Sequence, residues 1–234
     1  MRKQLSAYWR TYRAKQSFDF QQKILIRKLR KNRDITNKIS QAGLIYVHIP
    51  KCGGSSVKKA LLPYYDFPPG HYSANTYREA LGEHDYSNLH RFTVVRNPWD
   101  RLVSAYFYVM DKRHNKYSPN TYFRDKVLAK YIDFEDFVVS HIGEGKSLNF
   151  NHFVPQYKFI CDESEKIIVD NIIKLEDLTL GFEKLGKSLG RQFQLSVVNT
   201  SKREKDYRSY YNEKTKKIVE DVYSIDSNEF EYEF

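Results

Sequence analysis

The chain has 234 residues, which fits one large domain or two small ones, and a hydrophobic fraction of 41%, which is enough for a core. Its formal net charge of +10 favours an anionic partner, such as a nucleotide, a nucleic acid, an acidic glycan or a membrane surface, without choosing among them. Two cysteines, Cys52 and Cys161, exclude a disulfide scaffold, and the lack of any run of about 18 apolar residues excludes a membrane-spanning helix. We expect both thiols to be free in a reducing compartment. Because residues 1–13 contain no apolar segment of the kind found in secretory signals, we expect a cytoplasmic protein.

Residues 1–42 are basic and polar, and part of them has the pattern of an amphipathic helix with a cationic face. Such a helix either docks peripherally on a membrane or an acidic polymer, or is a solvated arm packed on the domain. We predict a basic N-terminal helical arm over residues 1–42 and a single domain over residues 43–234. The pattern consists of Ile24, Leu25, Ile26 and Leu29 among Lys23, Arg27, Lys28, Arg30 and Lys31.

Residues 44–49 form a short apolar, β-branched run bounded by Gly43 and Pro50, which predicts a buried strand. A loop over residues 50–56 follows, and then a helix over residues 57–62. In such a unit, glycine backbone N–H groups and the helix N-terminus bind an anion. Lysine supplies a full charge and serine hydroxyls donate hydrogen bonds. The loop lysine precedes both glycines, so the Walker pattern of ordinary ATPases and GTPases is not matched.

A second strand and helix follow at residues 92–95 and 98–110, with Asn97 as the expected cap. Arg96 stands at the end of this strand, where parallel α/β sheets bind ligands. Arg101 and Ser104 share a helix face and can form a second oxyanion site with it, although Arg101 alone is as well explained by a structural salt bridge. Two separate phosphate sites fit a nucleotide with phosphates at both ends of its ribose.

The rest of the chain completes an alternating pattern of strands and helices, which predicts a parallel α/β sheet. Residues 111–160 are expected to be helical and rich in loops. Residues 167–169 and 172–173 are expected to form strands near an edge of the sheet. Helices are expected over residues 178–189, where Gly190 is the stop signal, and over residues 210–223.

Two segments resemble motifs of sulfotransferases that use 3′-phosphoadenosine-5′-phosphosulfate (PAPS). Residues 46–56 resemble the 5′-phosphosulfate loop, and residues 95–106 resemble the 3′-phosphate motif. The group that matches best includes the carbohydrate 4-O- and heparan sulfate 2-O-sulfotransferases and many bacterial relatives. Residues 152–156, 174–178 and 199–203 are weaker matches in the same order. The resemblance covers about residues 44–223 and implies a P-loop-like three-layer fold with a central parallel sheet flanked by helices.

The resemblance also implies site residues. The 5′-phosphosulfate would be held by Lys51, Cys52, Gly53, Gly54, Ser55 and Ser56. Cys52 stands where many relatives carry threonine, and since a thiol is a weak donor, backbone N–H groups must contribute more there. Arg96 and Ser104 would hold the 3′-phosphate, and the nucleotide would be covered by Ser201, Lys202 and Arg203.

Sulfuryl transfer needs a general base for the acceptor hydroxyl and a cation near the leaving phosphate oxygen. We assign Lys51 as the cation and His71 as the base, because His71 follows a Pro-Pro-Gly loop and resembles the base of the 2-O-sulfating enzymes. His152 is the alternative base and a candidate substrate-binding residue, and His71 as a plain surface histidine is the other alternative. His48, inside the strand, is expected to be a packed core residue. No metal is required, and the histidines have no metal-ligand spacing.

The acceptor is expected to be a saccharide, possibly an acidic one, and no nucleic acid partner is expected. Two other functions stay open: another phosphate-loop enzyme, such as a kinase, and a basic protein that binds polyanions without catalysis. A kinase would need a magnesium carboxylate, for which Asp66 and Asp100 are poorly placed. Basic residues and aromatic rings of the middle region favour an acidic saccharide. The alternative is that the rings belong to the core and the charges are solvated. The basic residues are Lys112, Arg113, Lys116, Arg124 and Lys126, and the rings that could stack on sugars are Tyr108, Tyr117, Tyr122 and Phe123.

Overall fold

The computed structural model of the chain describes residues 18–64, 70–196, 204 and 206–234. These residues belong to two compact units. Of the described residues, 22–64, 70–96 and 156–196 form the sheet unit, and 18–21, 97–155, 204 and 206–234 form the helical unit. Each unit is described by itself.

The sheet unit contains three parallel strands in the order β1-β2-β3: β1 (Leu44–Val47), β2 (His90–Val95) and β3 (Asn171–Lys174). All of β1 and the last four residues of β2 are buried, as expected for apolar strands covered on both faces. Tyr46 pairs with Phe92 in the register, and Phe92 pairs with Asn171. The predicted α/β class with a parallel sheet is therefore confirmed.

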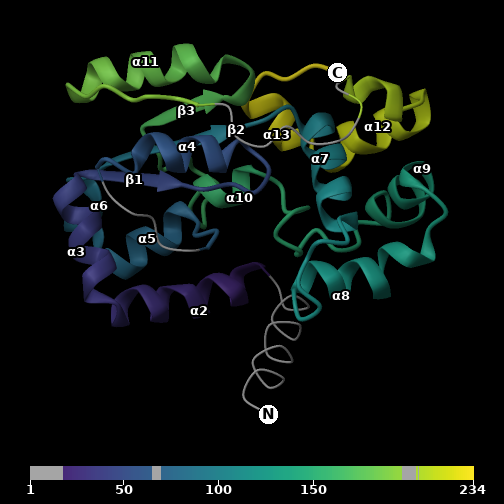
Figure 1. Cartoon of the computed structure of the whole chain (residues 1–234), viewed down its shortest axis with the longest axis horizontal. Coiled ribbons are helices and arrows are strands. Elements are labelled where there is room, and N and C mark those ends of the chain that lie inside the picture. The colour runs from purple at the N-terminus through teal and green to yellow at the C-terminus, as the bar shows by residue number, and fades with distance from the viewer. Residues whose placement is uncertain (1–17, 65–69, 197–203, 205) are drawn as a thin grey trace. The chain divides into compact units, whose positions relative to one another are not determined.

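Helices flank these strands (Figure 1), with α11 along one side and α3 and α5 on the other. Phe182 of α11 meets Phe92 of β2 edge to face, and Gly181 lets this helix approach Ile173 of β3. A left-handed Gly190 ends α11, as predicted. The helices of this unit are α2 (Phe18–Lys31, which begins in the helical unit), α3 (Arg33–Ala42), α4 (Gly54–Leu61), α5 (Ala74–Leu81), α6 (Glu83–Ser87), α10 (Tyr157–Ile160) and α11 (Leu178–Leu189), with a 3₁₀ turn at Leu175–Asp177.

One strand prediction is wrong. Residues 167–169 form no strand, and only an isolated bridge joins Cys161 to Ile167. The backbone of Ile168 bonds locally instead: its N–H donates to the Ile160 carbonyl, and its own carbonyl accepts from the hydroxyl of Tyr86. The neighbouring prediction at residues 172–173 is confirmed by β3.

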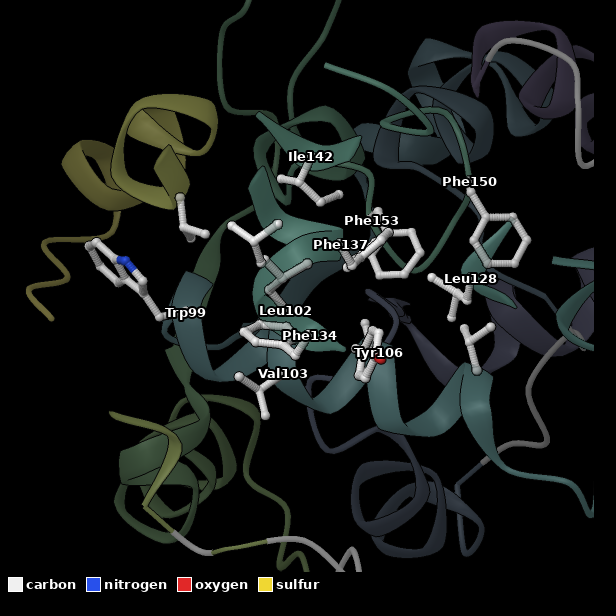
Figure 2. Close-up of a cluster of buried hydrophobic side chains, with 14 of the residues drawn as sticks. Trp99, Leu102, Val103, Tyr106, Leu128, Phe134, Phe137, Ile142, Phe150 and Phe153 are labelled. Atoms are coloured by element: carbon white, nitrogen blue, oxygen red, sulfur yellow. The ribbon is translucent and has the colours of Figure 1, made fainter. Parts of the chain in front are cut away.

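The helical unit has its own apolar core around α7 (Pro98–Met110), shown in Figure 2. Asn97 caps α7 as predicted, because its side chain accepts from the N–H groups of Trp99 and Asp100. Aromatic rings such as Tyr106, Phe137 and Phe153 fill the cluster. The other elements are α8 (Pro119–Lys126), a 3₁₀ turn (Leu128–Lys130), α9 (Phe134–Phe137), a π-helical turn (Val138–Ile142), a 3₁₀ turn (Tyr207–Tyr210), α12 (Glu213–Val222) and α13 (Ser224–Glu229).

The helix predicted over residues 210–223 begins later than expected. A capping box between Asn212 and Thr215 starts α12 at Glu213, and Tyr210 ends the preceding 3₁₀ turn. Within the described parts of the chain, no helix has the length and apolar character needed to cross a membrane.

Candidate active site

Residues 48–53 join β1 to α4 in the sheet unit. Because α4 begins at Gly54 and not at residue 57 as expected, the predicted loop of residues 50–56 includes the first turn of this helix. Lys51 and Gly53 both have left-handed backbones, with φ of 71° and 70°. The Gly53 carbonyl then accepts from the N–H groups of Ser56 and Val57, which closes the first turn of α4. The loop therefore leads directly into a helix N-terminus, whose N–H groups and partial positive charge favour an anion.

Both glycines of the loop stand where a side chain would collide. A Cβ on Gly53 would lie 2.6 Å from Cδ1 of Leu175, and a Cβ on Gly54 would lie 1.9 Å from Nε2 of His48. Leu175 belongs to the weaker matching segment at residues 174–178. The main chain of the loop therefore packs directly against Leu175 and His48, and neither position has room for a side chain.

The loop is tied to the end of β2 by direct hydrogen bonds. Nη1 of Arg96 donates to the carbonyl oxygen of Lys51 at 3.1 Å. The buried thiol of Cys52 donates to Oε1 of Gln156 at 3.2 Å, and the N–H of Arg96 donates to the same oxygen at 2.9 Å. The structure therefore brings together three of the predicted site residues, Lys51, Cys52 and Arg96. Gln156, which joins them, was not predicted as a site residue.

His71 is held in one tautomer by the backbone. Its Nδ1 lies 3.0 Å from the carbonyl oxygen of His48, and because a carbonyl can only accept, this nitrogen carries the hydrogen. The lone pair of the neutral ring is then on Nε2, where a general base needs it. The buried side chain of Gln22 supports the same segment, since its Nε2 donates to the His71 carbonyl and its Oε1 accepts from the N–H of Ser73.

The ring of His48 lies between the base candidate and the loop. Its centroid is 4.4 Å from that of His71, and its Nε2 faces Gly54. Burial, followed by the nearby His71 and Lys58, holds the pKa of His48 well below its ordinary value. His48 packs on its neighbours, but it lies just beyond β1, which ends at Val47, and it is half-buried, so the expectation of a core residue inside the strand is only partly correct. The sequence pattern could not show that it packs on His71 and Gly54.

Among the remaining predicted site residues, Ser55 is exposed and Ser56 is half-buried in the first turn of α4, in the sheet unit. Ser104 and His152 lie in the helical unit. Ser104, on α7, is 7% exposed, and His152 meets the ring of Tyr108 edge to face, at 5.0 Å between centroids. Arg101 is buried in the same unit, where its Nη1 donates to the Val154 carbonyl at 2.9 Å. This contact favours a structural role for Arg101. The predicted covering residues Ser201, Lys202 and Arg203 lie outside the described residues.

Among the residues that the structure describes, no group of three or more His, Cys, Asp or Glu side chains is arranged to hold a metal ion. In comparisons with known proteins, no curated protein and no solved structure matched this chain. A family model described as the sulfotransferase family matches residues 39–233. This match covers the strand–loop–helix unit, the end of β2 and the Gln156 segment, and so the chain belongs to the sulfotransferase family.

Proposed function

We propose that this sulfotransferase moves a sulfuryl group from PAPS to a hydroxyl of a saccharide, with His71 as the general base. Sulfotransferases generally use PAPS as the sulfate donor. The observation that carries the proposal is the arrangement in the sheet unit. The loop of residues 50–56 is bonded to Arg96, and the His48 ring connects that loop to His71.

The donor would be held by main chain and by cations. The backbone N–H groups at Gly53 and Gly54 and the N-terminus of α4 would bind the 5′-phosphosulfate, with Ser55 and Ser56 as hydroxyl donors. Cys52 is fully buried and its thiol donates to Gln156, so its side chain supports the loop, and its contribution to the donor would come from its backbone. Arg96 would bind the 3′-phosphate. The roles of Ser104 as a second ligand of this phosphate and of Ser201, Lys202 and Arg203 as a cover of the nucleotide stay predictions.

PAPS supplies a sulfuryl group attached to a phosphate leaving group. Nε2 of His71 would take the proton from the acceptor hydroxyl as the new S–O bond forms. The ammonium of Lys51 would stabilise the charge left on the phosphate oxygen as the old S–O bond breaks. The proton therefore ends on the histidine and the negative charge ends beside the lysine. His152 is the alternative base and could instead contact the acceptor.

The acceptor would meet basic residues and exposed rings of the helical unit. Two of the basic residues predicted to attract an acidic glycan are ion-paired, Arg113 with Asp111 and Arg124 with Asp125, while Lys112, Lys116 and Lys126 are exposed. Phe123 cannot stack on a sugar, because it is 6% exposed and stacked on Phe150 in the core. Tyr108 is 38% exposed and stays a candidate sugar-stacking ring. An acidic acceptor is supported chiefly by the overall charge of +10.

Neither of the other two functions has an observation of its own. A kinase-like enzyme would use a lysine after the last glycine of the loop, where this chain has Ser55. Asp100 is in the first turn of α7, and Asp66 lies outside the described residues. The basic face of α2 would serve a polyanion-binding protein, but such a protein needs no strand–glycine–helix unit. Peripheral membrane contact through residues 1–42 and a cytoplasmic location stay predictions.

The direct test is to incubate the protein with radiolabelled PAPS and a panel of natural and desulfated glycans, and to follow transfer of the label. We expect transfer to at least one glycan without added metal. His71→Ala should reduce turnover by about 10²-fold or more at saturating PAPS, while His84→Ala, at an exposed position on α6, should not. Absence of transfer to every glycan of the panel would contradict the saccharide assignment. Normal turnover of His71→Ala would remove this residue from the role of base.

A further inference from the structure

Gln156 is completely buried in the sheet unit, just before α10, and its amide group is hydrogen-bonded on both sides. Its Oε1 accepts from the N–H of Arg96 at 2.9 Å, and its Nε2 donates to the carbonyl oxygen of Arg96 at 2.8 Å. One side chain therefore pairs with both backbone polar groups of Arg96, as a neighbouring strand would. This pairing fixes the backbone of Arg96 where β2 ends.

The same oxygen of Gln156 also accepts from the thiol of Cys52, at 3.2 Å. Cys52 follows Lys51, whose left-handed backbone is unusual for a residue with a side chain and persists only where its surroundings hold it. The carbonyl of Lys51 in turn accepts from the guanidinium of Arg96. Gln156, Arg96 and the loop thus form a closed ring of hydrogen bonds, in which the Gln156 amide supplies three of the four bonds.

We propose that Gln156 is a positioning residue of the donor site: it holds the Lys51–Cys52 turn and Arg96 in the arrangement that binds the nucleotide. This inference rests on the proposed function, because it concerns the same donor site. Without the Gln156 amide, the N–H and carbonyl of Arg96 would lose the partners that it supplies. The thiol of Cys52 would keep only its longer bond to the Pro50 carbonyl, at 3.6 Å. The loop would then have to be ordered at the moment of binding, which weakens affinity.

A glutamate in place of Gln156 distinguishes a role in positioning Arg96 through hydrogen bonds from a role that depends only on the volume of the side chain. A protonated carboxyl can accept from the Arg96 N–H and donate to the Arg96 carbonyl, as the amide does. An ionised carboxylate can only accept, so it leaves the Arg96 carbonyl facing a negative charge. Because burial raises the pKa of a carboxyl group, Gln156→Glu should retain the native pattern in acid and lose it in mild alkali.

The experiment is calorimetric titration with adenosine 3′,5′-bisphosphate, without metal, into the wild type, Gln156→Glu and Gln156→Met. We expect Gln156→Met, which has similar volume and no amide, to bind about tenfold more weakly, equivalent to about 1.4 kcal/mol. Gln156→Glu should show a similar loss at about pH 8 and approach the wild-type value, measured at the same pH, at about pH 5.5. Leu185→Ala, a core truncation in α11, serves as the control for general destabilisation and should keep the wild-type affinity.

Each result decides something different. If the wild type does not bind the bisphosphate, the proposed function fails and this inference fails with it. If the wild type binds and both Gln156 variants bind equally well at every pH, the inference alone is overturned. The same holds if Leu185→Ala loses as much affinity as the Gln156 variants at a comparable loss of stability. Should Gln156→Met not fold, the pH dependence of Gln156→Glu alone decides, and a loss that does not recover in acid overturns the inference.

Discussion

Replacing Gly54 with alanine should disturb the site through the ring of His48. The added Cβ would lie 1.9, 2.6 and 2.8 Å from Nε2, Cδ2 and Cε1 of that ring, all shorter than any stable contact. The ring cannot easily turn away, because it stacks on Tyr46 at 5.5 Å and contacts His71 at 4.4 Å between centroids. Overpacking of this kind costs about 1–3 kcal/mol. Alanine is also more favourable than glycine in a helix by up to about 1 kcal/mol. The measured loss of stability is therefore smaller than the energetic cost of the clash itself.

A double-mutant cycle isolates the clash. The free energy of unfolding would be measured in urea for the wild type, Gly54→Ala, His48→Ala and the double variant. Since His48→Ala removes the ring that the new methyl group meets, the double variant should be more stable than the sum of the single changes predicts, by about 1–3 kcal/mol. Additivity within about 0.5 kcal/mol would show that the ring and Gly54 do not touch, and would refute the placement of His48 between the loop and His71.

Two further predictions concern the helical unit. Burial lowers the pKa of His141 from 6.5 to about 4, so the folded chain holds it neutral while the unfolded chain takes up a proton as the pH falls through 6.5. The stability of the protein should therefore be unaffected by His141 above about pH 6.5 and should decrease by up to about 3 kcal/mol toward pH 4. His141→Gln should lower this loss of stability in acid, measured by urea unfolding at several pH values. An unchanged pH profile in the variant would contradict the assignment. Replacing the buried Arg101 with methionine leaves the Val154 carbonyl without its 2.9 Å donor and should destabilise the protein by about 1–3 kcal/mol; a thermal midpoint equal to that of the wild type would show that this contact contributes nothing.

The local parts of the site could be predicted from the sequence. A β-branched run followed by the Gly53–Gly54 pair predicts a strand, a loop and a helix, which are β1, the loop and α4. Asn97 and Pro98 predict the start of α7. These features depend on residues within a few positions of one another, so propensity and capping decide them. The apolar run at residues 167–169 misled the prediction because hydrogen bonds to Ile160 and Tyr86, not a neighbouring strand, satisfy its backbone.

The long-range parts of the site could not be predicted. Gln156 is 104 residues from Cys52 and 60 from Arg96 in the chain, and a buried glutamine has no local pattern that announces two such partners. The tautomer of His71 is likewise set by a carbonyl 23 residues away, at His48. The motif at residues 152–156 was the available signal for Gln156, but it pointed to His152, which lies in the helical unit.

The central claim is that one nucleotide with phosphates at both ends of its ribose binds to this site, with Arg96 as a ligand of the 3′-phosphate. The most direct measurement is to titrate adenosine 3′,5′-bisphosphate and adenosine 5′-monophosphate, without metal, into the wild type and Arg96→Ala. We predict that the wild type prefers the bisphosphate by at least about tenfold and that Arg96→Ala loses most of this preference. Equal affinity of the wild type for both nucleotides would contradict the account. An equal loss for both nucleotides in the variant would mean that Arg96 only supports the loop through Lys51.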